Sequence, residues 1–570
     1  MKLLYWIGLI CSLIAPAAAI NREAFTVTKY DLEVRLEPEQ QRLEARGKIV
    51  LRNDSAEAQK VVALQISSSL SWRAIRVNEK TVQFVSQPYT SDIDHTGALS
   101  EAIVTLPAVI NPKDSVEVEV GYEGVIPQDS TRLTRVGVPV EIARHTSWDH
   151  IGASFTAVRG AGYVAWYPIT TESADFSEGN SLFEVVDRWK AREAGSEFKV
   201  RIGMDRRGEE TPPLIVCTSA NQSLIEQGGK EQRTSGECSW ERLGTVTPTF
   251  AMASYDNWFK APFNLLSLAG HEAGAAKYSS AFEPASKFVT EWFGKPSVPV
   301  AIADFADPHA APFESGTLLL VSMAGEDTKL AGINMVHELV HSAFPASRPW
   351  VYEGAAHFAE AVYREQQGGR QAALDFLGVH RSAFLDAEKE VSAAPQKNNG
   401  QPLATTFDET YYRSKAAYVW WMLRDMVGDD ALKVAIGKYL AADDKDPKYV
   451  EQLLKSTTKR DLGWFFNDWV YHDRGLPDIR VQSVHPWKTE REVQMITITL
   501  ENLGAAGAEV PFTVHCEGDD VTKRLEVRAK STATTRVELA GNPLEIVVND
   551  GSVPEMDLTN NVFRIQESQK

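Results

Sequence analysis

The periodicity of hydrophobic residues changes twice along this chain, and the two changes divide it into three parts. Short runs that alternate between apolar and polar residues, bounded by Asn, Asp, Pro and Gly, fill residues 25 to 258. Apolar residues then recur every three or four positions until about residue 476, where alternating runs return. Alternation of period two predicts half-buried antiparallel strands, and spacings of three and four predict amphipathic helices. The chain is therefore predicted to be a multidomain α+β protein.

The length of 570 residues supports this division, because single hydrophobic cores stop growing well below that size. We expect an all-β N-terminal domain over residues 20–258, without a long helix. A mainly helical domain over residues 259–475 follows, and a small C-terminal β-sandwich over residues 476–570 ends the chain. The sequence leaves the oligomeric state open.

Residues 1–19 have the layout of a secretory signal peptide. Lys2 precedes an apolar run from Leu3 to Ala15, and three alanines at 17–19 offer a cleavage site before Ile20. An uncleaved anchor helix is the alternative, but the run is short for a bilayer span. We expect an exported protein, periplasmic or extracellular, with no membrane segment after cleavage.

Charge and cysteine content restrict the partners and the compartment. The formal net charge is −18, and binding to nucleic acid or to an anionic membrane needs a basic face, so neither partner is expected. Cys217 and Cys238 lie on two strand-like runs joined by a polar link. In an oxidising compartment they can form a disulfide across this hairpin, or they can remain free. Cys516 is expected to be unpaired and buried.

Residues 337–341 read HELVH. On a helix, His337 and His341 lie on one face, one turn apart, so both imidazoles can bind one metal ion. Glu338 between them can take a proton from a water molecule that the metal activates. This spacing predicts a catalytic zinc site.

A catalytic zinc ion needs three protein ligands and one open position. The helix with the histidines should end near Pro345, and a second helix should begin near Trp350 and return a carboxylate to the metal. Glu360 follows His341 after eighteen residues. Glu353 competes for this role, although a carboxylate in a first helical turn also stabilises the helix dipole.

The His-Glu-x-x-His pattern, the eighteen-residue interval and the Trp-x-x-Glu-Gly lead-in resemble the zinc aminopeptidases of the membrane alanine aminopeptidase and leukotriene hydrolase family. The resemblance implies a thermolysin-like catalytic domain that binds one zinc ion per chain. Carried over by position, it implies His337, His341 and Glu360 as zinc ligands and Glu338 as general base. His357 is then expected beside the site rather than as a fourth ligand.

The family also carries a Gly-x-Met-Glu-Asn stretch whose glutamate binds the free α-amine of the substrate. Here the corresponding residues read APFESG, so the resemblance implies that role for Glu314, 23 residues before His337. Phe313 replaces the family methionine and Ser315 the asparagine, which leaves open whether Glu314 reads an amine.

Downstream, the family uses a tyrosine before a Lys-Gly-led helix to stabilise the oxyanion. Aligning Lys415 with that lysine places Arg413 at the tyrosine position and Tyr412 one residue earlier. The resemblance therefore implies Tyr412 as the oxyanion stabiliser, with Tyr411 in reserve. Arg413 can alternatively contact a substrate carboxylate.

Together these residues predict a secreted zinc aminopeptidase that removes N-terminal residues from peptide substrates. One alternative is a zinc endopeptidase or other hydrolase in which Glu314 does not bind an amine. Another is a non-catalytic protein-binding relative, although a scaffold has no need of the general base Glu338. Many family members end in a long helical domain that covers the active site, whereas the last part of this sequence is the predicted β-sandwich. The resemblance therefore does not establish how substrates reach the cleft or how large they can be.

Overall fold

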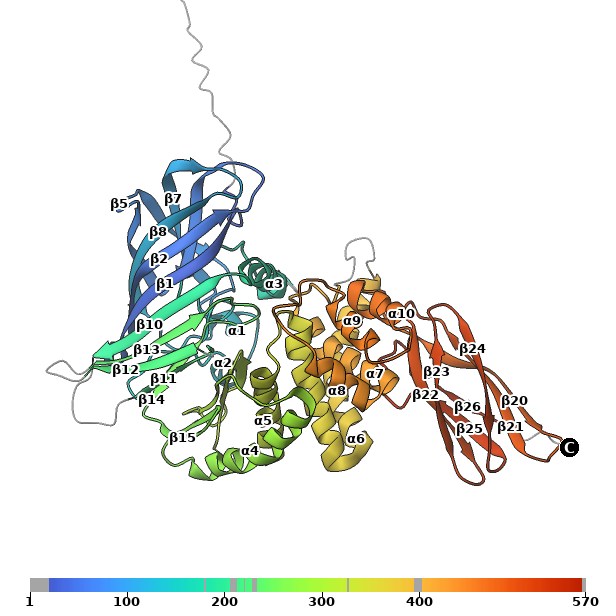
Figure 1. The fold of residues 1–570 in the computed structure, drawn as a ribbon. Coiled ribbons are helices and arrows are strands. Elements are labelled where there is room, and N and C mark those ends of the chain that lie inside the picture. The colour runs from blue at the N-terminus through green and yellow to red at the C-terminus, as the bar shows by residue number, and fades with distance from the viewer. Residues whose placement is uncertain are drawn as a thin grey trace, which may run out of the picture.

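The computed structural model describes residues 20–178, 181–205, 213–219, 221–227, 233–324, 328–393 and 402–565. The expected signal peptide, residues 1–19, lies outside these ranges. A β-rich N-terminal part, a largely helical central part and a C-terminal pair of sheets follow one another along the molecule (Figure 1). The chain is thus a mixed α+β multidomain protein. Within the described residues, no helix combines the length and apolar character needed to cross a membrane.

The N-terminal part is built around an eight-stranded sheet of order β12-β13-β10-β1-β2-β8-β4-β5, in which β1 and β10 run parallel and the other neighbouring strands antiparallel. Its strands are β1 (Phe25–Glu37), β2 (Arg42–Asn53), β4 (Leu70–Val77), β5 (Lys80–Thr81), β8 (Ser115–Val125), β10 (Glu197–Asp205), β12 (Asn221–Gln227) and β13 (Arg233–Trp240). Two three-stranded sheets accompany it: β3 (Gln59–Ser67), β7 (Ala98–Ile110) and β6 (Phe84–Thr90), and β11 (Leu214–Cys217), β14 (Phe250–Ala253) and β9 (Phe155–Val158).

The expectation that this part contains no long helix is wrong. Two short helices, α1 (Thr131–Arg135) and α2 (Val140–Thr146), precede the thirteen-residue helix α3 (Ser181–Glu193). In α3, Leu182, Val185 and Trp189 recur at helical spacing and are buried in the core of the N-terminal sheets. A single helix between strand-like runs offers too few turns for its period to stand out, and packing on the sheets completes its apolar face.

The disulfide that the sequence offered as one alternative is present, but it does not cross a hairpin. Cys217 and Cys238 are bonded. They lie on β11 and β13, which belong to different sheets rather than to one hairpin. The bond therefore joins the eight-stranded sheet to its smaller neighbour. Cys516 is free and buried, as expected.

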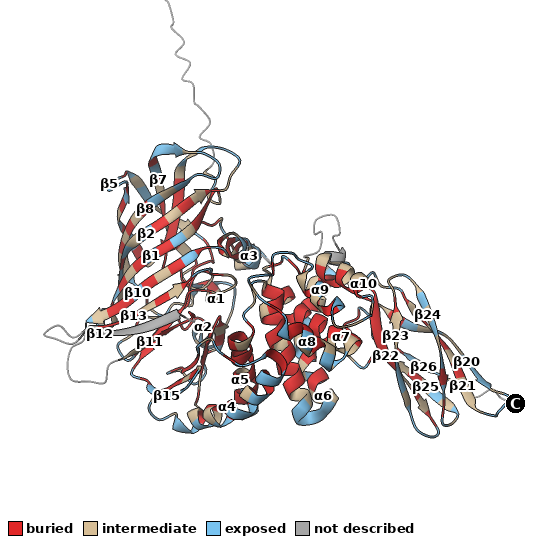
Figure 2. Ribbon diagram, viewed as in Figure 1, coloured by how far each residue is buried: buried red, intermediate tan, exposed pale blue. Residues whose placement is uncertain are grey.

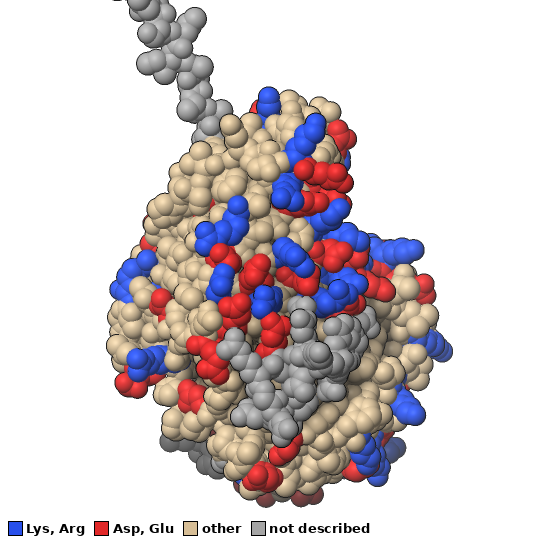
Figure 3. All heavy atoms as spheres, turned by 90° about the vertical axis from the view of Figure 1, so that its left-hand side faces the viewer, with Lys and Arg blue, Asp and Glu red and all other residues tan. Residues whose placement is uncertain are grey.

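Side chains of both signs alternate on the outer face of the N-terminal part (Figure 3). Several of them form ion pairs across neighbouring strands, among them Arg46–Glu33, Lys48–Glu117 and Arg201–Glu237. Exposed pairs of this kind contribute little to stability, because water and salt screen them. This face therefore carries no field of one sign, in spite of the net charge of −18.

The central part begins with a five-stranded mixed sheet of order β15-β16-β17-β19-β18. Its strands are β15 (Asp256–Lys260), β16 (Phe263–Ser267), β17 (Val300–Asp304), β19 (Leu318–Val321) and β18 (Phe313–Ser315). The three inner strands run parallel, and the two edge strands are antiparallel to their neighbours. The expected domain boundary at residue 258 falls within β15. Glu314 lies on the edge strand β18.

Helices cover this sheet and continue beyond it. They are α4 (Glu272–Phe293), α5 (Thr328–Ala343), α6 (Pro349–Ala393), the π-helical turn η3 (Thr410–Lys415), α7 (Ala416–Val427), α8 (Asp429–Gly437), α9 (Tyr449–Lys455), α10 (Gly463–Phe466) and a second π turn, η4 (Asn467–Tyr471). As expected, α5 ends just before Pro345 and α6 begins beside Trp350. Gly369, with φ of 78°, interrupts α6.

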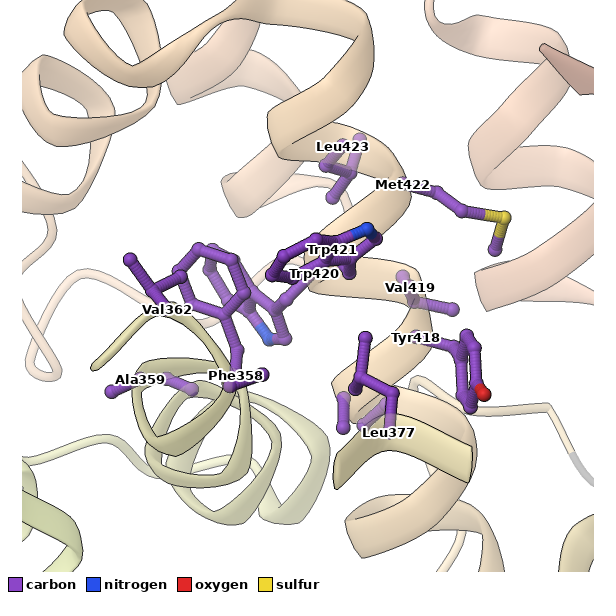
Figure 4. Close-up of a cluster of buried hydrophobic side chains, with 14 of the residues drawn as sticks. Phe358, Ala359, Val362, Leu377, Tyr418, Val419, Trp420, Trp421, Met422 and Leu423 are labelled. Atoms are coloured by element: carbon purple, nitrogen blue, oxygen red, sulfur yellow. The ribbon is translucent and has the colours of Figure 1, made fainter. Parts of the chain in front are cut away.

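Helices α6 and α7 pack through large apolar side chains that come from both helices (Figure 4). Phe358, Leu377, Trp420 and Trp421 are buried there, and Figure 2 colours much of the helical part as buried. Burial of side chains of this size contributes about 1.5–3 kcal/mol each. These extensive apolar contacts hold α6 and α7 in a fixed position relative to each other.

The helices also approach one another closely at a glycine. A Cβ added at Gly354 would lie 2.5 Å from the Cβ of Ala416, the first residue of α7. The glycine of the Trp-x-x-Glu-Gly run therefore lets η3 and α7 lie directly against the first turns of α6. This contact brings the side chains of η3 to Glu353.

The C-terminal part consists of two antiparallel sheets, as expected for a β-sandwich. One contains β20 (Ile479–Lys488), β21 (Gln494–Asn502) and β24 (Thr532–Glu538), and the other β23 (Val521–Val527), β22 (Ala508–Cys516), β25 (Pro543–Val548) and β26 (Val562–Arg564). Ile498, Val510 and Ile546 are buried between them. Their apolar core is continuous with that of the helices, so the joint is packed.

Candidate metal centre

Helix α5 brings two buried imidazoles together. The Nε2 atoms of His337 and His341 face each other at 3.0 Å, and their ring centroids are 4.7 Å apart. Two nitrogens that bind one tetrahedral zinc ion at the usual distances lie about 3.3 Å apart. The pair therefore has the spacing of two ligands of one ion.

Two carboxylates lie on the same side of these rings. The oxygens of Glu353 are 3.9 Å from the two Nε2 atoms, and those of Glu314 are 3.7 Å from them. The ligand atoms of all four residues lie within 4.8 Å of one another. Within the described structure, Glu353 Oε2 and Glu314 Oε1 are buried without a hydrogen-bond partner. A cation between the four side chains would satisfy these atoms, so the donor set fits zinc.

Glu360, expected as the third ligand, lies on the other side of the His337 ring. Its Oε1 atom is 3.2 Å from His337 Nδ1, and its Oε2 atom is 2.7 Å from His357 Nδ1. A histidine that binds metal through Nε2 usually donates its Nδ1 proton to such a carboxylate. Glu360 thus lies where it can orient His337, and Glu353 lies beside the Nε2 atoms. The ligand atoms of His337, His357 and Glu360 also lie within 4.8 Å of one another, so the expected role of Glu360 as third ligand stays a prediction.

The helix period explains why the two glutamates were hard to separate in the sequence. Glu353 and Glu360 are seven residues apart, which is about 20° short of two full turns, so both face α5. They differ by about 10.5 Å along the axis of α6. Glu353 therefore lies at the Nε2 edge of the two histidines, and Glu360 lies at the Nδ1 edge of His337. The sequence signal for Glu353 was the Trp-x-x-Glu-Gly run itself.

The electrostatics of the ring pair follow from these contacts. Burial lowers the pKa of His337, but the carboxylates of Glu360, Glu314 and Glu353 together outweigh this and raise the pKa to about 10. Burial lowers the pKa of His341. The carboxylates therefore favour a positive charge on His337, whereas burial disfavours one on His341.

Glu338 lies beside this cluster and is completely buried. Neither of its carboxylate oxygens has a hydrogen-bond partner in the described structure. Burial raises its pKa well above the ordinary carboxyl value, and the negative charges of Glu314 and Glu353 add to the effect. A carboxylate with a high proton affinity and free oxygens suits a general base.

Glu314 and Arg413 form an ion pair at the edge of the cluster. Arg413 Nη2 donates to Glu314 Oε2 at 2.7 Å and lies 3.5 Å from Glu353 Oε2. Burial raises the pKa of Glu314, but the Arg413 guanidinium and the two imidazoles outweigh it and hold that pKa below its usual range. Glu314 is therefore an ionised carboxylate. Its role toward a substrate amine remains a prediction.

Tyr412 and Tyr411 are both buried on η3. Lys190 from α3 pairs with Glu409 at 2.7 Å and lowers the pKa of that carboxyl to about 2, with a further contribution from the Tyr412 hydroxyl. The tyrosine hydroxyl is thus directed to Glu409, and Arg413 is the η3 side chain in contact with the carboxylates of the cluster.

Tyr352 connects one ligand to the edge strand. Its ring stacks on His341 with a centroid distance of 3.8 Å, and its hydroxyl donates to the carbonyl of Gly316 at 3.0 Å. Gly316, with φ of +66°, forms the turn that follows β18. This contact ties the position of Glu314 to that of the metal-binding helix.

A buried ion triad anchors η3 on its other side. Lys415 Nζ donates to Glu388 Oε1 at 2.6 Å and to Asp473 Oδ1 at 2.7 Å, and all three side chains are buried. The triad links α6, η3 and the segment after η4. It therefore fixes the turn from which Arg413 projects.

Replacing Lys415 by methionine should destabilise the protein by about 3–5 kcal/mol, because two carboxylates would remain buried without their cation. Urea denaturation of the two proteins, followed by tryptophan fluorescence, measures the change in the free energy of unfolding. A stability equal to that of the wild type would show that the triad does not hold η3. The exposed variant Lys488→Met serves as the control.

No family model and no curated protein matches this chain. Among solved structures, it is similar to an M1 zinc metallopeptidase from Deinococcus radiodurans, with 16% identity and a TM-score of 0.48 over 79% of this chain and 94% of the other. A mutant of that protein bound to a Tyr-Ser-Ala substrate gives 15% identity and a TM-score of 0.47 over 80% and 96%. A two-domain mutant bound to L-arginine gives 14% and 0.46 over 76% and 91%. These structural neighbours are M1 zinc metallopeptidases.

Proposed function

We propose that this protein is a zinc-dependent peptidase that holds one zinc ion per chain through His337, His341 and Glu353. The observation that carries the proposal is the convergence of two buried imidazole nitrogens and two carboxylates beside the unpartnered carboxyl group of Glu338. Such a centre has no evident use in a protein that only binds a partner. When bound, zinc polarises the scissile carbonyl and lowers the pKa of a water molecule.

The proton transfers belong to Glu338. Its carboxylate takes a proton from water while the water oxygen bonds to the carbonyl carbon and an electron pair moves onto the carbonyl oxygen. It then gives the proton to the amide nitrogen as the carbon–nitrogen bond breaks and the carbonyl re-forms. Glu360 holds His337 in orientation through Nδ1 throughout these steps.

The finer proposal is an aminopeptidase that removes N-terminal residues, with Glu314 pairing with the substrate ammonium and placing the first peptide bond at the centre. A second candidate is a hydrolase that does not read the amine. The Arg413–Glu314 ion pair favours it, because it already satisfies one oxygen of Glu314.

A comparison of a peptide that has a free N-terminus with its acetylated twin tests the finer proposal. A charged hydrogen bond contributes about 1.5–3 kcal/mol, so the free peptide should have a kcat/KM roughly 10–100-fold higher. The measurement is cleavage of both peptides by the zinc-loaded protein, followed by mass spectrometry. Equal rates would support the second candidate, and internal cleavage would identify an endopeptidase.

We also propose that the mature protein is exported, after cleavage of residues 1–19. The Cys217–Cys238 disulfide supports an oxidising compartment. N-terminal sequencing of the protein from its native host tests the cleavage site, which should leave Ile20 as the first residue. An intact N-terminus in the cytosolic fraction would contradict export.

A further inference from the structure

Arg413 lies where the edge strand, the ligand-bearing helices and η3 meet. Its Nη2 atom is 2.7 Å from Glu314 Oε2, and that same oxygen is 3.7 Å from Nε2 of His337. The guanidinium is therefore separated from the converging imidazole nitrogens by a single anionic oxygen. Two other cationic side chains, Lys190 and Lys415, lie near η3, but they pair with Glu409 and Glu388 rather than with the carboxylates of the cluster.

The hydrogen-bonding capacity of Arg413 is not used up by this ion pair. A guanidinium has five N–H donors in a planar fork. Within the described structure, Arg413 Nε is buried and without an acceptor. The side chain as a whole is 29% exposed, so part of the guanidinium is accessible from outside the buried cluster. It can hold Glu314 through Nη2 and still offer donors to a second oxygen.

We propose that Arg413 is a catalytic residue, whose guanidinium donates to the carbonyl oxygen of the scissile bond and stabilises the negative charge that develops there. The inference rests on the proposed peptidase function. Arg413 Nη2 already donates to an anionic oxygen at 2.7 Å, and an oxyanion accepts the same kind of charge-assisted hydrogen bond as a carboxylate oxygen.

This assignment replaces the one that the family resemblance implied for Tyr412. The Tyr412 hydroxyl is directed to Glu409, whereas Arg413 contacts Glu314 and approaches Glu353. The guanidinium also carries its charge at every pH at which the protein is folded. Of the η3 side chains, Arg413 thus combines contact with the cluster, a free donor and a permanent charge.

The alternative role for Arg413 is a countercharge that keeps Glu314 ionised. Two variants separate the roles: Arg413→Gln, and the double variant Arg413→Gln/Glu314→Gln, which removes both charges and keeps the pair electrically balanced. The control is Arg480→Gln, which breaks an exposed arginine–glutamate pair in the C-terminal sandwich. Tyr412→Phe is measured in parallel.

For each protein, zinc content, kcat and KM are measured on a peptide that the wild type cleaves. Calorimetry then compares the affinity for a phosphinic peptide, whose tetrahedral anion replaces the scissile bond, with that for an uncleavable peptide of the same sequence. This affinity ratio cancels any effect on ground-state binding, including loss of an amine contact.

We expect Arg413→Gln to keep about one zinc ion per chain, to lower kcat by roughly 10²–10³-fold and to lower the affinity ratio by a similar factor. The double variant should show the same loss in the ratio, because balancing the charges does not replace the donor. If Arg413→Gln alone folds poorly, the charge-balanced double variant still distinguishes a hydrogen-bond donor from a countercharge.

Recovery of the wild-type ratio in the double variant would overturn the proposal and leave Arg413 as a countercharge. Retention of kcat by Arg413→Gln, with a 10²-fold loss in Tyr412→Phe, would return the role to the tyrosine. Either result leaves the peptidase function standing. A wild-type protein that binds no zinc, or cleaves no peptide, would instead overturn the proposed function itself.

Discussion

Replacing Glu338 by glutamine is expected to lower kcat by roughly 10²–10⁴-fold while the zinc content stays near one ion per chain. Glutamine has the shape of glutamate but cannot take a proton from water. Glu338 lies outside the set of side chains whose ligand atoms converge, so its replacement should leave the metal in place.

Steady-state kinetics on the zinc-loaded proteins, together with elemental analysis, checks this prediction. Glu291→Gln on the surface of α4 is a matched control, because that carboxylate is exposed and pairs only with Lys433 in the described structure. Wild-type turnover in Glu338→Gln would rule out the general-base role. Loss of zinc would instead show that Glu338 contributes to metal binding.

The second large effect concerns the choice of the third ligand. Glu353→Gln is expected to weaken zinc binding by more than 100-fold, because it removes a ligand charge. Glu360→Gln should cost only about 10–100-fold, the usual effect of losing a partner that orients a ligand. His341→Ala should abolish stoichiometric binding, since a single histidine and one carboxylate would remain.

Competition with a chelator of known affinity at pH 7 measures all three variants on one scale. The two glutamine variants are matched in chemistry and lie on the same face of α6, so their order decides the assignment. A larger loss in Glu360→Gln would favour the ligand set implied by the eighteen-residue interval. Full zinc retention by His341→Ala would contradict both sets.

Much of the fold follows from hydrophobic periodicity. The strand-rich ends and the helical middle were predicted from it, and Pro345 predicted the break between α5 and α6. Helix α3 was missed because a single amphipathic helix gains its stability from the sheets on which it packs. The disulfide partners were identified as one alternative, but sheet assignment decided which elements they join.

The two histidines and Glu338 could be placed from the sequence alone, because residues within two turns of one helix have positions that the helix period determines. The third carboxylate and Arg413 could not be placed in this way. Their distances from the histidines depend on how α5, α6 and η3 pack, and the close contact at Gly354 and the buried Trp420 and Trp421 set that arrangement. Local geometry thus determined the metal-binding pair, whereas only tertiary packing decided which edge of the histidines Glu353 and Glu360 each face and brought the guanidinium of Arg413 to the site.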